Sequence, residues 1–177
     1  MEVEPYFSQN FAPNPPAVQM YKQQLFIDAR DFQSEITENN KMEFTVKFSS
    51  HYENNSLNLG AYSEITQVEL LGLCFPKIAN ENYVIVDIPE FHGVMHSSDN
   101  TGSHDKFAIV YFDNAQMSPG DTKPMKGKDF APKICKLNPS LKRLNKFTIR
   151  FLKYGGANIT PVELKNVSLL LEFTIKA

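Results

Sequence analysis

The sequence has little of what would mark a disulfide-rich, membrane-bound or secreted protein. Among its 177 residues there is no Trp, and Cys74 and Cys135 are the only cysteines. Both lie in apolar segments, so we expect two buried thiols in a reducing compartment, with a disulfide as the alternative. No stretch approaches the roughly 20 apolar residues of a membrane helix, and the acidic start MEVEPYFSQN is unlike a secretory signal. These absences predict a protein that is soluble and intracellular when it is made.

An excess of charge of either sign is also missing. The 18 Lys and Arg residues and 20 Asp and Glu residues leave a net charge of −2 and a pI near 6.1. Binding of nucleic acid through bulk charge is therefore not expected, because it depends on neutralising phosphates with Lys and Arg. Positive charge is concentrated in KPMKGKDFAPKICK and LKRLNK. We interpret these segments as solvated loops, with an anionic contact surface as the alternative.

Recognisable catalytic motifs are absent. The segment YGGANI lacks the lysine and hydroxyl of a phosphate-binding loop, so Gly155-Gly156 is interpreted as a tight turn. There is no G-x-S-x-G nucleophile elbow. Cys135 lies between Lys133 and Lys136, which could lower a thiol pKa, but no histidine is near it in the sequence. We therefore expect no catalytic residue and no enzyme activity.

A histidine-rich segment is the best candidate for a metal site. FHGVMHSSDNTGSHD contains three histidines and two aspartates, namely His92, His96, His104, Asp99 and Asp105. The spacing of His92 and His96 would suit metal binding on a helix, but Gly93 and SSDNTGS favour a loop. The H-x-H pattern with a later Glu that is typical of cupin metalloenzymes is missing. We expect an exposed polar loop, with neither a metal nor another cofactor.

From residue 24 onward the hydrophobic pattern has a period of two, which predicts strands with one buried face. The alternation is clearest in MEFTVKFS, NKFTIRFLK and SLLLEFTIK. The residues expected to face the core in these segments are Met42, Phe44, Val46, Phe48, Phe147, Ile149, Phe151, Leu169, Leu171, Phe173 and Ile175. KFAIVYFD and YVIVDI are more continuously apolar and predict central strands. In ITQVELLGL the alternation slips at Leu70-Leu71, which predicts a bulge near Gly72.

About eight strand candidates, with LFIDAR and the short PKICKLN included, are separated by turn-rich spacers. Helix evidence is confined to NPSLKRLNK, where Asn138 could cap one turn, although a turn leading into the next strand fits equally well. Long spacers, roughly 33–41, 50–63, 91–105, 114–130 and 154–166, favour crossings between two sheets over tight hairpins. The prediction is an all-β fold: a single eight-stranded antiparallel jelly roll of two packed sheets, over residues 24–177.

The first 23 residues differ from the rest and are predicted to form an extended N-terminal arm. Pro13, Pro15 and Pro16 fix φ and remove backbone donors, and the segment has no strand or helix period. Spaced apolar residues along it could anchor it to a neighbour: Tyr6, Phe11, Val18, Met20 and Tyr21. We expect the arm to lie on another subunit, with a tail folded back on its own domain as the alternative.

The segment LFIDARDF places Asp28, Arg30 and Asp31 beside an apolar run. These residues could form a catalytic constellation or the polar side of a strand. On a strand, one face would hold Leu25, Ile27 and Ala29, and the other Phe26, Asp28 and Arg30. Asp28 and Arg30 would then point the same way and could pair with each other or across strands. We favour a structural role, in which they fix a register or an interface.

Together these segments resemble the single jelly-roll capsid proteins of nucleocytoplasmic large DNA viruses. In that family an IDSRDR-like segment precedes an F-x-V-x-L-like strand, as LFIDARD precedes NNKMEFTVKF here. The residue types that follow in the family are matched in order by Val68, Leu70, Pro76, Tyr83 and Ile85. LNKFTIRFLKYGGANI is similar to the family's L-d-r-l-t-i-r-f-x-d-x-x-G segment. The resemblance covers about residues 24–177, and it departs from the pattern at Ala29, where the family tends to have Ser, and at Phe32, where it tends to have Arg.

The resemblance implies a structural protein of an icosahedral viral capsid. Small single jelly rolls of the family serve as pentons at the vertices or as minor capsid proteins beneath the major shell, and we favour a penton that forms a homopentamer. The implied partners are further copies of the chain, the major capsid protein and other minor capsid proteins. A contact with an inner membrane is left open, and direct contact with nucleic acid is not expected. The implied location is the capsid of a virion assembled in the host cytoplasm.

Two alternatives remain beside the penton. One is a minor capsid protein away from the vertices. The other is a jelly-roll binding module for a carbohydrate or a host receptor, with Tyr52, Tyr62 and Phe91 as candidate exposed aromatics in loops. The expected assembly contacts are Tyr6, Phe11, Pro13, Pro15, Pro16, Asp28 and Arg30.

Overall fold

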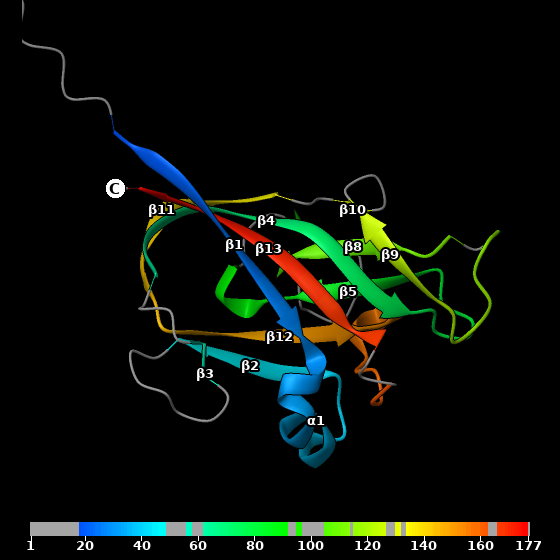
Figure 1. The fold of residues 1–177 in the computed structure, drawn as a ribbon. Coiled ribbons are helices and arrows are strands. Elements are labelled where there is room, and N and C mark those ends of the chain that lie inside the picture. The colour runs from blue at the N-terminus through cyan, green and yellow to red at the C-terminus, as the bar shows by residue number, and fades with distance from the viewer. Residues whose placement is uncertain are drawn as a thin grey trace, which may run out of the picture.

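The computed structural model describes residues 18–48, 56–57, 62–91, 95–96, 105–113, 115–126, 130–131, 134–162 and 166–176. Two β-sheets pack face to face around one hydrophobic core (Figure 1). All the ladders between strands are antiparallel in this part of the chain except one short parallel pairing. The predicted all-β class is confirmed. No helix in these ranges is long and apolar enough to cross a bilayer.

The five-stranded sheet has the order β1 (Met20–Asp28), β13 (Ser168–Lys176), β4 (Tyr62–Pro76) and β11 (Ile134–Leu144), and β9 (Thr122–Lys126) also pairs with β4. β11 pairs with the first half of β4 and β9 with its second half. Both strands therefore lie along the edge of β4 that faces away from β13.

The six-stranded sheet has the order β10 (Phe130–Ala131), β8 (Ala108–Tyr111), β5 (Tyr83–Asp87), β12 (Lys146–Leu152), β2 (Glu43–Phe48) and β3 (Ser56–Leu57). The strands predicted to be central, KFAIVYFD and YVIVDI, lie in its interior as β8 and β5. A separate ladder joins β6 (Met95–His96) to β7 (Asp105–Lys106). The predicted count of eight strands is not confirmed, because short strands extend both sheets.

The core is built as the alternating pattern predicts. Every core residue predicted from the three alternating segments is buried. Aromatic rings link the two sheets: the Phe75 and Phe151 centroids are 4.7 Å apart, and Phe173 lies 6.1 Å from Phe91 and 6.3 Å from Phe147. Such ring pairs add stability beyond the area that they bury. The abundance of Phe in the sequence is therefore largely accounted for by the interior.

Strand β4 contains the predicted bulge. Successive residues of β13 pair with Gly72 and then with Leu70, which leaves Leu71 as an extra residue. A second irregularity leaves Thr66 unmatched in the same way. Each extra residue reverses the alternation of the faces. The buried residues of β4 are consequently spaced unevenly, at Ile65, Val68, Leu70, Leu73 and Phe75.

The first helical segment lies in a spacer for which no helix was predicted. A 3-10 turn, η1 (Ala29–Phe32), leads directly into the helix α1 (Gln33–Asn39), and Asn40 ends it with a φ of 49°. Ala29, Phe32 and Ile36 are all buried, and their spacing of three and four residues is a helical period. Phe32 stacks on Phe44 with 4.6 Å between ring centroids. This packing against the core outweighs the polar composition of the segment.

The segment NPSLKRLNK forms neither of the two turns predicted as alternatives for it, a helical turn or a turn leading into the next strand. Most of it forms the second half of β11, whose pairing with β4 is irregular between Lys136 and Leu141. Pro139 is tolerated there because β11 is the outermost strand beside this half of β4 within the described ranges. The predicted turn at Gly155-Gly156 is confirmed: both have positive φ, and the Gly156 N–H donates to the Lys153 carbonyl at 3.1 Å.

The boundary of the N-terminal arm also differs from the prediction. β1 begins at Met20, so residues 20–23 belong to the five-stranded sheet rather than to an arm. The alternation there is hidden because Met20, Tyr21 and Lys22 are all exposed. Five predicted assembly contacts lie outside the described residues: Tyr6, Phe11, Pro13, Pro15 and Pro16.

Candidate assembly surface

Strand β1 forms an edge of the five-stranded sheet. It pairs with β13 over its whole length, from Met20 opposite Lys176 to Asp28 opposite Ser168. Within the described residues no strand pairs with its other edge. A nine-residue edge presents a row of backbone N–H and C=O groups that another chain can pair with.

Exposed apolar side chains are concentrated on this edge. Among the described residues five large hydrophobic side chains are exposed, and four of them lie on β1 or just before it. Their exposed fractions are 54% for Val18, 50% for Met20, 49% for Tyr21 and 62% for Phe26. The fifth, Tyr111, lies on the other sheet. Soluble proteins manage hydrophobic edges with charge, proline or a covering element, so this concentration indicates a contact surface.

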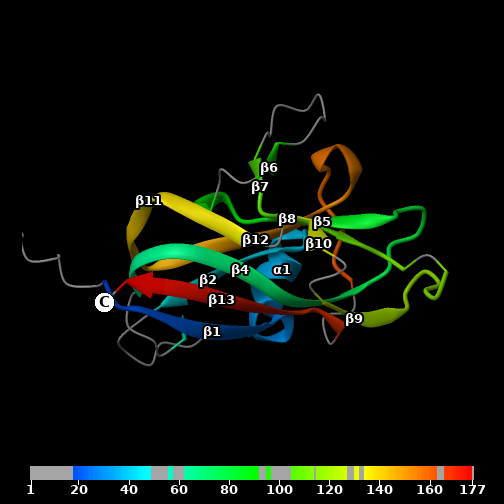
Figure 2. The same ribbon diagram turned by 90° about the horizontal axis from the view of Figure 1, so that it is seen from above.

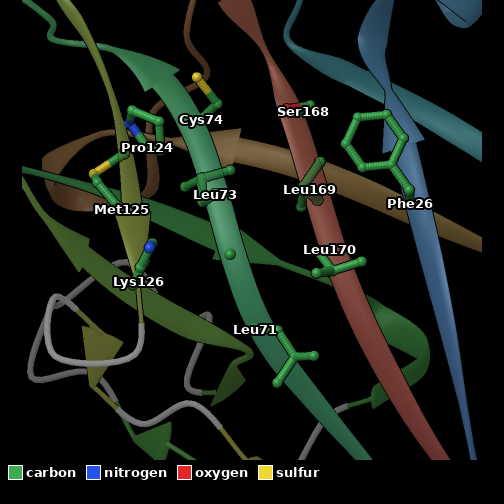
Figure 3. Close-up of a pocket in the computed structure, with 11 residues that line it drawn as sticks. Phe26, Leu71, Leu73, Cys74, Pro124, Met125, Lys126, Ser168, Leu169 and Leu170 are labelled. Atoms are coloured by element: carbon green, nitrogen blue, oxygen red, sulfur yellow. The ribbon is translucent and has the colours of Figure 1, made fainter.

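An apolar groove of about 400 Å³ continues from Phe26 across the outer face of the same sheet (Figure 3). β13 contributes Leu170, β4 contributes Leu71 and Cys74, and β9 contributes Pro124. The bulge of β4 lies in this wall, at Leu71 and Gly72. A Cβ at Gly72 would lie 3.8 Å from the Met125 carbonyl oxygen and 3.9 Å from the Leu170 Cβ, which is ordinary contact. There is therefore room for a side chain at Gly72, and its absence deepens the groove at this position.

The other half of this outer face is polar. Lys22 of β1 donates to Glu172 of β13 at 2.6 Å, and the Gln24 amide donates to the other oxygen of the same carboxylate at 3.0 Å. These two hydrogen bonds hold the pKa of Glu172 below its ordinary value, and the one from Lys22 has the larger effect. Glu172 alternates with core residues as predicted, but it is largely buried because the side chains of β1 cover it.

Asp28 and Arg30 pair with each other, which is one of the two arrangements predicted for them. The Arg30 Nε donates to Asp28 Oδ1 at 3.0 Å, and Nη2 donates to Oδ2 at 2.5 Å. Arg30, however, lies in η1 rather than on the strand, and its backbone N–H also donates to Asp28 Oδ1 at 2.9 Å. The hydrogen bonds from the Arg30 side chain lower the pKa of Asp28. Within one chain the pair caps the 3-10 turn η1, which follows β1. A role of the pair in assembly stays a prediction.

The two cysteines are free thiols. Cys135 is buried as predicted, and its thiol donates to the Phe91 carbonyl at 3.2 Å. Burial raises the pKa of Cys135 to about 11, which is opposite to the shift that a nucleophilic thiolate needs. Cys74 is only half-buried, at the wall of the apolar groove.

Most of the remaining candidates from the sequence lie outside the described residues. The side chains of the histidine-rich segment 92–105 lie outside the described residues. Elsewhere, among the side chains that the structure describes, no three His, Cys, Asp or Glu residues could hold one metal ion. Phe91, a candidate aromatic for a glycan site, is fully buried in the 3-10 turn η2 (Pro89–Phe91). Tyr52 and the side chain of Tyr62 are not described.

No protein-family model matches the chain, and no curated protein matches its sequence. The surface formed by β1 and the groove must therefore be interpreted on its own geometry. It combines a strand edge with which no other described strand pairs, exposed apolar side chains and an apolar groove next to them. These features suit association with another polypeptide.

Proposed function

We propose that the protein is a structural component of an icosahedral viral capsid, built on a single jelly roll, and that it forms the homopentameric penton at the vertices. The capsid role rests on the resemblance of residues 24–177 to the single jelly-roll capsid proteins of large DNA viruses. The fold and the β1 surface supply independent support. A non-vertex minor capsid role uses the same fold and surface and is the alternative within this class.

Strand pairing is the observation that supports the jelly roll. A jelly roll can be drawn as one long antiparallel hairpin of eight strands, rolled so that strand 1 pairs with 8, 2 with 7, 3 with 6 and 4 with 5. The corresponding pairs here are β1 with β13, β2 with β12, β4 with β11 and β5 with β8. With these strands numbered 1 to 8, the sheets have the orders 1-8-3-6 and 5-4-7-2. The remaining short strands are additions to this plan.

The β1 surface supports association as the activity. Phe26, Met20 and Tyr21 are exposed together on an edge strand, which carries an energetic cost in an isolated soluble chain. A ring with cyclic symmetry uses two different patches on each subunit. In the ring that we propose, the β1 edge and the adjoining groove form one of these two patches.

Native mass spectrometry of the full chain tests the proposal. A ring of five would have a mass of about 100 kDa, from a chain of 20.1 kDa. A strictly monomeric chain would overturn the penton. A monomer that bound glycans in an array screen would favour the jelly-roll binding module instead. Location at pseudo-hexameric positions of a particle would leave only the minor capsid role.

We propose further that residues 1–17 lie on a neighbouring subunit or an adjacent capsid protein. Prolines at positions 13, 15 and 16 stiffen this segment, which lowers the entropy lost on docking. In this proposal the segment docks on another chain, so deletion of residues 1–17 should leave the melting temperature of the isolated domain nearly unchanged while assembly fails. A full-length control with Tyr6→Ser and Phe11→Ser separates the apolar anchors from the length of the segment. A marked fall in melting temperature on deletion would assign the segment to its own domain.

A further inference from the structure

A second cavity of about 400 Å³ lies on the outer face of the six-stranded sheet. Its lining is polar, in contrast to the apolar groove on the other sheet. Five charged side chains line it: Lys41, Glu43, Asp87, Lys106 and Arg150. The turn after β12 adds Gly156 and Asn158. In Figure 2 this turn and β7 rise from the same side of the molecule, above β5 and β12.

The sheet itself aligns the charges at the centre of this cavity. Arg150 of β12 is in register with Glu43 of β2 on one side and with Asp87 of β5 on the other. Residues in register on neighbouring strands point to the same face, so the three side chains form one row. Their backbone positions are fixed by ladders in the interior of the sheet. The row is therefore a rigid platform rather than a set of loop residues.

Arg150 is only loosely bound to its two neighbours. Its Nε lies 3.4 Å from Glu43 Oε1, and its Nη1 lies 3.7 Å from Asp87 Oδ2. Both distances exceed the roughly 2.7–3.2 Å of an ordinary N–H···O hydrogen bond. The Nε atom is buried and has no hydrogen-bond partner in the part of the chain that the structure describes. Buried N–H groups are almost always satisfied, so the loose pairing leaves the guanidinium short of acceptors. The Arg150 side chain is nevertheless 40% exposed, so its outer N–H groups can reach a ligand.

The charge balance of the cavity favours an anion. Three cationic side chains face two carboxylates. Lys106 and Asp87 are 2% and 6% exposed, and both make further interactions within the chain. Lys41 is exposed at the rim, and its ammonium forms no ion pair among the described residues. The excess positive charge is therefore carried by Arg150 and Lys41, at a partly buried site where charge interactions are stronger than in water.

We propose that this cavity binds a small oxyanion, a phosphate or a carboxylate group, between Arg150 and Lys41. The planar guanidinium matches such groups through two parallel hydrogen bonds. Glu43 and Asp87 flank it on the two neighbouring strands. The volume would accommodate roughly a dozen water molecules at about 30 Å³ each, so the oxyanion can belong to a larger small molecule. The inference does not depend on the proposed capsid role.

The test uses the full chain and three sodium salts: phosphate, acetate and, as the reference at matched ionic strength, chloride. Binding to the folded state alone raises the melting temperature in a concentration-dependent way. We expect phosphate or acetate to raise it beyond chloride, and the stronger of the two identifies the group preferred. In amide NMR spectra, Gly156 and Asn158 should shift and saturate over the same concentrations.

Three variants locate the effect. Lys41→Gln should weaken binding about tenfold, as expected for the loss of one charge-assisted hydrogen bond. Arg150→Lys keeps the charge but loses the planar fork, so it should weaken binding at least as much. Lys47→Gln is the matched control, because Lys47 is exposed on the same face of β2 but does not line the cavity.

Three outcomes would overturn the proposal. The first is a melting temperature that neither phosphate nor acetate raises beyond chloride. The second is a loss of binding in Lys47→Gln equal to that in Lys41→Gln, which would indicate screening by general surface charge. The third is a saturable shift of Gly156 and Asn158 with calcium chloride and none with the two oxyanions, which would assign the cavity to a cation.

Discussion

The outer faces of the two sheets are built from the same alternating pattern but have different chemistry. On the five-stranded sheet the outward residues near the bulge are apolar, with Phe26, Leu71 and Leu170 around a groove. On the six-stranded sheet, outward-facing residues of three neighbouring strands form the charged row Glu43, Arg150 and Asp87. The inner faces, by contrast, are alike and pack against each other in one core.

This difference shows how a two-sheet fold can separate its tasks. The inner faces are committed to stability, so function is confined to outer faces, edges and loops. An apolar face next to an edge that no described strand covers suits contact with another polypeptide. A charged row fixed by strand register suits a small ion. The two outer faces can thus change independently of each other, and the predictions below exploit that independence.

The largest effect is expected for the core that both faces share. Phe151→Ala should lower the free energy of unfolding by about 3–5 kcal/mol, because it leaves a cavity between the sheets. Phe151 is fully buried and packs against Phe75 and Phe44. Phe26→Ala is the matched control, since the same truncation on an exposed ring should cost about 1 kcal/mol or less. Urea denaturation of both variants measures the difference in the free energy of unfolding. Equal losses would contradict the assignment of Phe151 to the inner face and Phe26 to the outer face.

A smaller effect on stability, but a decisive one on association, is expected on the apolar face. Phe26→Asp should weaken assembly by about 2 kcal/mol or more if the ring is a buried contact in the assembly, while the chain still folds. Tyr111→Asp introduces the same charge at the exposed aromatic of the other sheet and should leave assembly intact. Sedimentation velocity over a range of concentrations compares them. Equal dissociation in both variants would remove the β1 surface from the proposal.

The polar half of the same face should contribute less. Glu172→Gln is expected to cost no more than about 1 kcal/mol at neutral pH, because Lys22 is largely exposed and its pairing is screened by solvent. The pKa of Glu172 is lowered in the folded state, so its contribution is present above the ordinary value of 4.5 and is lost as the pH falls through the folded value. Stabilities of wild type and variant should converge in acid. A constant difference from pH 7 to pH 2 would show that the charge is not involved.

The smallest effect is expected at Asp28. Asp28→Asn should cost only about 0.2–0.5 kcal/mol, because Asn still accepts the backbone N–H of Arg30 and only the exposed ion pair is lost. Asp28→Ala loses the cap as well and should cost about 1 kcal/mol. Thermal melts of the two variants separate the contribution of the capping hydrogen bond from that of the ion pair. If the assembled state instead loses much more stability than the free chain, the pair takes part in an interface.

The core could be predicted from the sequence because alternation is a local signal. Phe44, Val46 and Phe48 need only their own spacing to be assigned to one face. The bulge at Leu71 was predictable for the same reason, since two adjacent leucines break the alternation. Helix α1 could have been found from the spacing of Phe32 and Ile36, but its polar composition hid that signal.

The two surfaces to which we assign functions could not be predicted, because they depend on which strands become neighbours. Glu43 and Arg150 both appear as ordinary solvent-facing residues in their strands, and only the pairing of β2, β12 and β5 sets them beside Asp87. Burial of Glu172 likewise requires β1 to lie beside β13. Such register is set by the whole sheet and leaves no mark in a short window of sequence.

The pairing of β1 with β13 also determines when the proposed assembly surface can form during synthesis. Gln24 and Glu172 are 148 positions apart, so at about 5–20 residues per second a ribosome makes β13 roughly 7–30 s after β1. Until β13 is made, β1 cannot form the edge of the five-stranded sheet. The groove also lacks the strand that lies between β1 and β4. A growing chain therefore lacks the complete surface that we propose for assembly until β13 has been made. The association that we propose for this surface would then follow closure of the sheet within each chain.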